Sequence, residues 1–296
     1  MPQEKPVISI VTPTYNRGHL LPRLFQSIRQ QGHEHFEWVV VDDGSIDNTC
    51  QVVRTFEAEL RHRFKYLQLP KNQGVNAARN QGVRSSGGEW VLFVDSDDEL
   101  FPEALEIIAS RVNVDVNVGA MGFLALRLPE NVIQGYRAFD ETWSHVLIPR
   151  ENLVLKRHIP GDMFWLVKKA VFKAGIWFPE WINGFERLFF SRLAQKWNVL
   201  AIRETIGIVH FEPDENHLST EPWKKWPEAF GKGYETFIRE NLDVLARYPQ
   251  VLIGMSRSAI SCYIHSHHYL KSLVLTLKAT RWVLKSVGSW LFSRSP

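Results

Sequence analysis

Short apolar runs alternate with stretches of helical periodicity along the first 112 residues. Runs typical of buried strands occupy Val7–Val11, Glu37–Val41, Phe64–Leu69 and Trp90–Asp95. Apolar residues recur at helical spacing over Leu20–Gln31, Asp47–Glu59 and Gly74–Ser85. Strands that alternate with helices predict an α/β fold, with a mostly parallel sheet and helices on both faces.

The pattern is weaker after Pro102. Helices are expected up to about Val112, over Lys168–Lys173 and over Leu188–Lys196, and strands over Val114–Leu128 and Leu200–Val209, with irregular chain over Phe139–Glu151. From Glu221 onward the chain becomes mostly helical and rich in Trp and Lys. This change of character predicts a soft domain boundary near that residue.

The run Trp90–Val94 ends in a cluster of carboxylates. Asp95, Asp97 and Asp98 follow it within four residues. Side chains two apart on an extended segment point the same way, so Asp95 and Asp97 are placed to share one ion. Carboxylate oxygens favour magnesium or manganese over zinc or copper. The alternative is a turn that only caps the helix beginning near Phe101.

Polar residues follow three of the predicted strands, at the point where each strand ends. These loops are Pro13–Arg17, Asp42–Ser45 and Asp95–Asp98. Right-handed crossovers place the carboxyl ends of parallel strands along one edge of the sheet, and ligands bind outside that edge. The sequence therefore predicts one crevice lined by all three loops.

The segment Asn72–Asn80 begins a predicted helix directly after a strand. Free amides at a helix N-terminus favour phosphate, and Arg79, one turn further on, is able to reach the same anion. The segment is neither a Walker loop nor a dinucleotide fingerprint, because the residues of both motifs are missing. Taken alone, it is also well explained as an ordinary helix start.

Charge and cysteine usage limit the classes of partner. The formal net charge of the 296 residues is only +3, which argues against a dedicated nucleic-acid binder. Cys50 and Cys262 lack metal-ligand spacing, so neither a disulfide framework nor a zinc site is indicated. With no secretory signal and no apolar stretch of about 18 residues, we expect a cytoplasmic protein without a membrane span.

Four of these motifs, taken in order, resemble the family 2 glycosyltransferases, which are inverting enzymes of the GT-A fold. The matching segments are Ser9–Arg17, Val40–Ser45 with Asp47 and Thr49, Asn72–Gly82, and Val94–Asp98. The resemblance is looser from Ile159 to His210 and gives no help beyond about Ser219. It implies a GT-A type, Rossmann-like catalytic domain over residues 1–220, followed by a helical extension over 221–296. Within the domain, residues 1–112 form the nucleotide-sugar-binding half and 113–220 the acceptor-side half.

The resemblance implies a nucleotide-sugar donor, with UDP as the expected nucleotide. The donor-binding residues implied by position are Thr12, Tyr15, Arg17, Asp42, Asp43, Asn76, Arg79, Asp95 and Ser96. The implied ligands of a Mn²⁺ or Mg²⁺ ion are Asp97, which would be the principal one, with Asp95 and His210. Such an ion would neutralise the leaving diphosphate. Simpler alternatives are a turn and helix cap at Asp42–Ser45 and a structural role for His210.

Inversion by a single displacement also requires a base that takes the proton of the acceptor hydroxyl. Members of the family commonly supply it from the Asp of a Glu-Asp pair that precedes an Arg-Leu. Aligned on Arg192-Leu193, the chain has Glu186 in the place of the base and Phe185 in the place of the preceding acid. Aligned on the Glu, it has Arg187 there. The alternative role of Glu186 is a charge at a helix N-terminus.

The acceptor implied by the resemblance is a glycan or a lipid-linked molecule, in the assembly of a surface polysaccharide or glycolipid. Candidate acceptor-side residues are Trp165, Trp181 and Asp162, although Trp residues serve as core at least as often. A nucleotidyltransferase is disfavoured because the loop after the first strand is not glycine-rich. A catalytically silent nucleotide-sugar-binding scaffold stays open, because Phe185 departs from the family pattern.

The segment Tyr269–Phe292 predicts one helix with apolar residues at helical spacing. Lys271, Lys278 and Lys285 recur at every seventh residue. A basic amphipathic helix of this kind is able to lie on the cytoplasmic face of an anionic membrane, but its cations prevent it from spanning one. The alternative is a helix packed on the catalytic domain or on a second subunit, so a homo-oligomer stays open.

Overall fold

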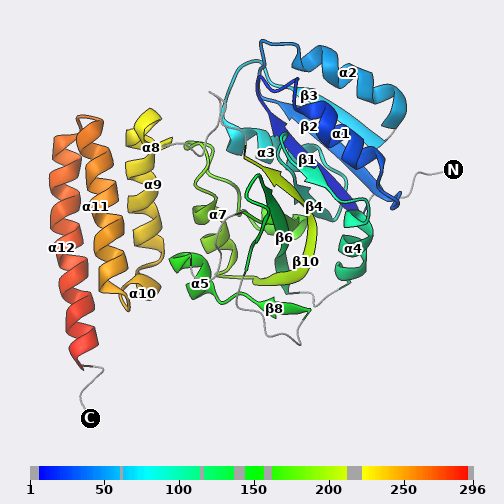
Figure 1. The fold of residues 1–296 in the computed structure, drawn as a ribbon. Helices are drawn as coiled ribbons and strands as arrows, with labels where there is room; N and C mark the ends of the chain where they lie inside the picture. The colour runs from blue at the N-terminus through cyan, green and yellow to red at the C-terminus, as the bar shows by residue number, and fades with distance from the viewer. Residues whose placement is uncertain are drawn as a thin grey trace.

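The computed structural model describes residues 7–60, 63–113, 117–136, 144–156, 162–211 and 222–292, with side chains up to residue 285 (Figure 1). An α/β domain holds the sheet, and the last helices stand beside it as a separate layer. Of the stretch expected to be irregular, Phe139–Glu151, residues 139–143 lie outside the described residues, and the rest contains a short strand, His145–Leu147, and the start of a helix.

The first half of the chain folds as its periodicity predicts. Its parallel strands are β1 (Ile8–Thr14), β2 (Phe36–Asp42), β3 (Phe64–Gln68) and β4 (Trp90–Phe93). Its helices are α1 (Leu21–Arg29), α2 (Thr49–Leu60), α3 (Val75–Ser85) and α4 (Ala104–Arg111). The strands lie in the order β3-β2-β1-β4, so the crossovers carry all four carboxyl ends to one edge.

The second half extends the same sheet as β4-β9-β6-β10-β5. Its strands are β5 (Glu99–Leu100), β6 (Val118–Leu128), β7 (Val132–Gln134), β8 (His145–Leu147), β9 (Phe164–Lys168) and β10 (Asn198–His210). Its helices are α5 (Arg150–Leu155), α6 (Lys169–Lys173) and α7 (Glu186–Leu193). Strand β9 was not expected from the sequence, and it pairs antiparallel with both β4 and β6.

Alternate side chains of each central strand point to opposite faces of the sheet, and helices cover both faces. Ile8, Ile10 and Trp38 pack against α1, α2 and α4. Val11 and Val39 pack in the core on the other face, which α3, α6 and α7 cover. The predicted α/β fold with helices on both faces is therefore confirmed.

Glycine at position 82 sets how closely α3 approaches the sheet. A Cβ atom there would lie 2.3 Å from Cγ1 of Val11, so any larger residue would push the helix away. The close packing of α3 on β1 fixes the start of that helix at the carboxyl edge of the sheet.

The C-terminal helices are α8 (Pro222–Lys225), α9 (Pro227–Glu240), α10 (Leu242–Leu245), α11 (Pro249–His265) and α12 (Tyr269–Phe292). They are joined to the α/β domain by a shared apolar cluster and by ion pairs. Phe237 packs with Leu188 of α7, and Arg192 of α7 pairs with Glu240 through contacts of 2.7 and 2.9 Å. In the described part of the chain, no helix is long and apolar enough to cross a membrane.

Candidate active site

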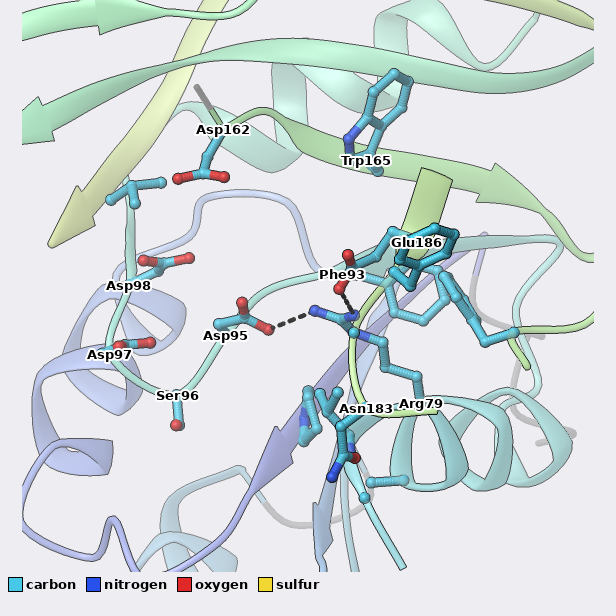
Figure 2. Close-up of a pocket in the computed structure, with 18 of the residues that line it drawn as sticks. Arg79, Phe93, Asp95, Ser96, Asp97, Asp98, Asp162, Trp165, Asn183 and Glu186 are labelled. Atoms are coloured by element: carbon cyan, nitrogen blue, oxygen red, sulfur yellow. Dashed lines mark hydrogen bonds and ion pairs between the residues drawn. The ribbon is translucent and has the colours of Figure 1, made fainter. Parts of the chain in front are cut away.

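The three polar loops meet at one cavity of about 1030 Å³ outside the carboxyl edge of the sheet. The loops after β1, β2 and β4 form one wall together with the start of α3. Strand β9, the start of α7, the end of β10 and helix α9 form the other. Figure 2 shows the acidic turn after β4 and the base candidate within this cavity. The expected convergence of the loops is therefore confirmed.

Three carboxylates crowd the turn that follows β4. The Asp95 side chain is 49% exposed, whereas Asp97 is nearly buried and accepts a hydrogen bond from Nη1 of Arg17 at 3.0 Å. Burial raises the pKa of Asp98 well above its usual range, and the charges of Asp95, Asp97 and Asp162 raise it further. Negative charge at this turn thus exceeds what Arg17 compensates.

That excess charge is suited to a divalent cation. Asp95 and Asp97 offer hard oxygen ligands, which Mg²⁺ and Mn²⁺ prefer. Within the described ranges, however, no three His, Cys, Asp or Glu side chains are already grouped as a metal site. A cation held here would therefore take much of its shell from diphosphate or water oxygens, as Mg²⁺ does when it is bound by few carboxylates. The residues present fit the implied metal on those terms.

Arg79 joins the acidic turn to the base candidate. Its buried guanidinium donates to Oε1 of Glu186 at 2.7 Å and to Oδ1 of Asp95 at 3.2 Å, on the two sides seen in Figure 2. Burial alone would lower the pKa of Arg79, but the two carboxylates raise it above its ordinary value, so the group stays charged. One cation thus fixes the spacing between the two carboxylates.

The backbone before Glu186 takes an unusual path. Gly184 and Phe185 both have positive φ angles, of 71° and 62°, and turn the chain sharply into α7. The side chain of Phe185, which the alignment on Arg192-Leu193 puts in the place of an acid, packs edge-on against Phe230 and Tyr234 of α9. Phe185 thus joins the C-terminal helices to the loop that precedes Glu186.

Asn76 has a structural place rather than the donor-binding place that the resemblance implied. Its buried Nδ2 donates to the carbonyl oxygens of Pro179, Ile182 and Gly184 at 3.0, 2.7 and 2.7 Å. These residues form the loop that leads into Glu186. Asn76 therefore holds the backbone of the base candidate and does not line the cavity.

Two further implied donor residues, Thr12 and Asp42, also lie outside the described lining of the cavity. Thr12 is buried and accepts from Nε1 of Trp38 at 2.9 Å. Asp42 accepts from the Ser45 amide at 2.8 Å and from the Tyr66 hydroxyl at 2.6 Å. The side-chain oxygens of Thr12 and Asp42 accept hydrogen bonds from Trp38 and Tyr66, which are distant in sequence. Both residues therefore stabilise the loops, and local sequence pattern does not reveal these contacts.

The neighbouring residues Asp43 and Thr14 do line the cavity. Asp43 accepts from the backbone amides of Gln73 and Gly74, at 2.7 Å each. Burial and the nearby Asp42 raise the pKa of Asp43 in spite of those bonds. The Thr14 hydroxyl, which the sequence did not single out, is buried without a hydrogen-bond partner among the described residues. Its position as the last residue of β1 was the available signal.

His210 lies on the cavity at the end of β10. Its Nε2 is 2.6 Å from Oε1 of Glu99, a carboxylate that Arg23 also approaches at 3.5 Å. Histidines that bind metals usually hold a carboxylate with the other ring nitrogen, which fixes the orientation of the ring. The contact with Glu99 is therefore compatible with the implied ligand role and equally with a structural one.

The remaining implied residues divide between the cavity and its surroundings. The implied donor-binding residues that line the cavity are Tyr15, Arg17, Asp43, Arg79, Asp95 and Ser96. Of the candidate acceptor-side residues, Trp165 lines the cavity and packs on Phe190 with ring centroids 4.2 Å apart. Trp181 is 39% exposed and lies under Lys232 instead. Helix α9 adds Phe230 and Tyr234 to the lining, a contribution of the C-terminal helices that no motif indicated.

With this geometry established, comparison with known proteins decides the family. Residues 9–174 match the family model described as glycosyl transferase family 2, which is more than half of the chain. This protein belongs to glycosyltransferase family 2. The resemblance carried by its four motifs is therefore confirmed, and the matched range includes the acidic turn and Arg79 but ends before Glu186.

Sequence relatives of this protein include three bacterial proteins. An uncharacterised glycosyltransferase of Haemophilus influenzae is 30% identical over 166 residues, 56% of this chain and 54% of that protein. A GalNAc(5)-diNAcBac-PP-undecaprenol beta-1,3-glucosyltransferase of Campylobacter jejuni is 38% identical over 36% of this chain and 35% of its own. The chain thus matches about half, or less, of the length of these relatives. The putative colanic acid biosynthesis glycosyl transferase WcaA of Escherichia coli is 26% identical over 83% of this chain and 85% of WcaA.

Solved structures confirm the fold. S. aureus TarS in complex with UDP-GlcNAc superposes with a TM-score of 0.64 at 23% identity, over 79% of this chain and 66% of that one. The mannosyltransferase PcManGT of Pyrobaculum calidifontis, in complex with GDP-Man and Mn²⁺, superposes with a TM-score of 0.58 at 16% identity, over 99% and 89%. The expected GT-A type architecture is the one that these glycosyltransferases share.

Proposed function

We propose that this protein transfers a sugar, with inversion, from a nucleotide-sugar donor to a hydroxyl of a glycan or lipid-linked acceptor. The observation that carries the proposal is the contact of Arg79 with both Asp95 and Glu186, which joins an acidic donor-side turn to a base within one cavity. A role in surface polysaccharide or glycolipid assembly is supported by the names of WcaA and of the Campylobacter relative.

The donor occupies the wall formed by the loops after β1, β2 and β4. Tyr15 and Asp43 bind the nucleoside of the donor, and Arg17 and Arg79 face its diphosphate. The expected nucleotide is UDP. Asp97 and Asp95, with His210, would hold a Mn²⁺ or Mg²⁺ ion, which would neutralise charge on the leaving diphosphate. The complexes of TarS with UDP-GlcNAc and of PcManGT with GDP-Man and Mn²⁺ support a nucleotide-sugar donor and a divalent cation as ligands of this fold.

Glu186 takes the proton of the acceptor hydroxyl as that oxygen attacks the anomeric carbon. Its side chain is 43% exposed, so an acceptor is able to reach it from the cavity. Arg79 orients the carboxylate, and the loop held by Asn76 positions the backbone. The proposed place of action is the cytoplasmic face of the membrane, which the free thiols of Cys50 and Cys262 support.

A panel of nucleotide sugars tests this function. Hydrolysis and transfer are measured for UDP- and GDP-linked sugars with Mn²⁺, with Mg²⁺ or with a chelator, and with polyprenyl-diphosphate glycans as acceptors. We expect turnover of one donor that the chelator abolishes. Metal-dependent donor binding without any turnover, unchanged in Glu186→Gln, would instead identify a silent nucleotide-sugar-binding scaffold.

A further inference from the structure

Helix α12 has two apolar faces over its described side chains, which end at residue 285. One face packs on protein within the described part of the chain, and the other is exposed. Leu275 and Ala279 are buried, together with Ser272, on the face toward α11. In Figure 1 this helix is the outermost element of the C-terminal layer, on the side away from the sheet. Its remaining surface therefore faces away from the catalytic domain.

The uncovered face of α12 is a stripe of large apolar side chains. Its members, which we call the α12 stripe, are Leu270, Leu273, Val274, Leu277 and Leu284, with exposures between 42% and 75%. At about 100° per residue they fall in a sector of roughly 100°, directly opposite the buried face. Single exposed apolar residues are common on protein surfaces, but a contiguous exposed apolar patch usually marks an interaction surface.

The charges on α12 indicate which kind of partner covers the stripe. Residues 269–292 contain four cations, at Lys271, Lys278, Arg281 and Lys285, and no Asp or Glu. Lys271 and Lys278 pair with Glu228 and Glu235 of α9, at 2.7 and 2.9 Å. These two ion pairs fix the rotation of the helix and so fix the outward direction of the stripe.

The other two cations accompany the stripe itself. Arg281 falls inside the sector of the stripe and Lys285 on its flank, by the same helical geometry. Neither has an ion-pair partner within the part of the chain that the structure describes. A second copy of α12 would bring Arg281 against another acid-free helix, which like charge disfavours.

Positive charge is also concentrated in the whole C-terminal layer. Residues 222–296 hold eleven Lys and Arg but four Asp and Glu, a formal charge of +7. Because the whole chain carries +3, residues 1–221 carry −4. The protein is therefore electrostatically polarised, with its basic end at the helices that carry the stripe.

We propose that the α12 stripe seats this protein on an anionic lipid surface, with Arg281 and Lys285 reaching the headgroups. An apolar face inserts at the boundary between headgroups and acyl chains, and long basic side chains extend out of it to the phosphates. The inference deepens the proposed function, since a lipid-linked acceptor would be presented at that surface, but the binding itself does not require catalysis.

Vesicle flotation of the full chain tests the inference. Vesicles of equal parts phosphatidylcholine and phosphatidylglycerol are compared with vesicles of phosphatidylcholine alone. The stripe variant replaces Leu270, Leu273, Leu277 and Leu284 by Ser, and the charge variant is Arg281→Gln with Lys285→Gln. The control is Ile133→Ser, which removes an apolar side chain of 55% exposure on β7. Circular dichroism checks that each variant is folded.

We expect the wild type and the control to float with the anionic vesicles. The stripe variant should bind the anionic vesicles at least about tenfold more weakly, because it loses buried apolar area. The charge variant should bind about tenfold more weakly, because each cation near an anionic surface raises the affinity several-fold. Donor hydrolysis in solution should be the same for all four proteins. Loss of hydrolysis in the wild type would contradict the proposed function without affecting the flotation result.

Three results would overturn the membrane inference. The first is a wild type that stays with the soluble fraction, and the second is equal flotation of the stripe variant. The third is a concentration-dependent dimer, seen by sedimentation, that the stripe variant abolishes, because the stripe would then be a contact between two copies of the chain.

Discussion

The two edges of the parallel sheet treat buried carboxylates in opposite ways. At the amino edge, Glu37 of β2 accepts from the Ser9 hydroxyl at 2.6 Å and from the Gly87 amide, and pairs with Lys65 at 2.6 Å. Burial alone would raise the pKa of Glu37, but these partners lower it below its ordinary value. The charge at this edge stabilises the fold.

At the carboxyl edge the same type of group is left under-compensated. Burial and neighbouring carboxylates raise the pKa values of Asp43 and Asp98. Perturbed carboxylates of this kind gather at functional sites, where a ligand supplies the missing positive charge or hydrogen bonds. This difference between the two edges indicates that the carboxyl edge binds a ligand, which supplies the positive charge or hydrogen bonds that the protein lacks there.

The largest effect should come from Glu186→Gln, which tests whether the carboxyl edge carries out chemistry. The amide keeps a hydrogen-bond acceptor for Arg79 but has no basic oxygen. We expect the transfer rate to fall about a hundredfold to a thousandfold, with nearly unchanged donor affinity. Rates are measured with the donor found in the nucleotide-sugar panel, and Glu59→Gln, at a surface pair with Arg29, is the matched control. An unchanged transfer rate would show that Glu186 is not the base and acts only as a charge at the N-terminus of α7.

Asn76→Asp should come next, because it places a carboxylate against three carbonyl oxygens. We expect the protein to lose about 2 kcal/mol of stability and the turnover rate to fall about tenfold, since the loop before Glu186 loses its donor. Thermal unfolding and steady-state kinetics measure the two effects. Asn152→Asp, at an amide that donates to the Tyr136 hydroxyl, is the control. A variant with lower stability but wild-type turnover would contradict the positioning role.

Asp98→Asn should stabilise the metal-free protein, by about 1.5 kcal/mol at pH 7. A carboxyl whose pKa is raised on folding costs stability as the pH rises from its ordinary value of 3.8 through the raised one. The stability gap between the variant and the wild type should therefore widen over that range and then stay constant. Urea unfolding at several pH values measures it. If the Asp98→Asn variant were less stable than the wild type at pH 7, the negative charge of Asp98 would be compensated in the folded protein.

Glu37→Gln should have the smallest effect and the opposite sign, with a loss of about 1 kcal/mol at pH 7. Because the pKa of Glu37 is lowered on folding, its contribution is present above the ordinary value of 4.5 and is lost as the pH falls through the lowered one. The gap between the variant and the wild type should close in acid. A gap that persists at low pH would mean that the partners of Glu37 recognise its shape rather than its charge.

Much of the first half could be predicted from local pattern, because its strands are short apolar runs and its polar loops all follow strand ends. Strand β9 could not, since its five residues lead straight into helix α6 and its place is set by pairing with β4 and β6. The convergence of the loops followed from topology rules, whereas the contribution of α9 to the cavity lining comes from a region without motifs.

Individual side chains were harder to predict than the place of the site. Thr12 and Asp42 stand at motif positions, yet Trp38 and Tyr66 bind them. For the lysines at every seventh residue of α12, a signal did exist in the sequence. Glu228 and Glu235 have the same spacing, and each pairs with one of them.

The most direct test of the carboxyl edge is calorimetric titration of UDP and GDP into the protein, with Mn²⁺ or with a chelator. We predict that one nucleotide binds the wild type and Glu59→Gln only with Mn²⁺, and that Asp97→Ala weakens this binding about a hundredfold. Equal binding with the chelator, or wild-type affinity in Asp97→Ala, would contradict a cation-assisted donor site at this edge.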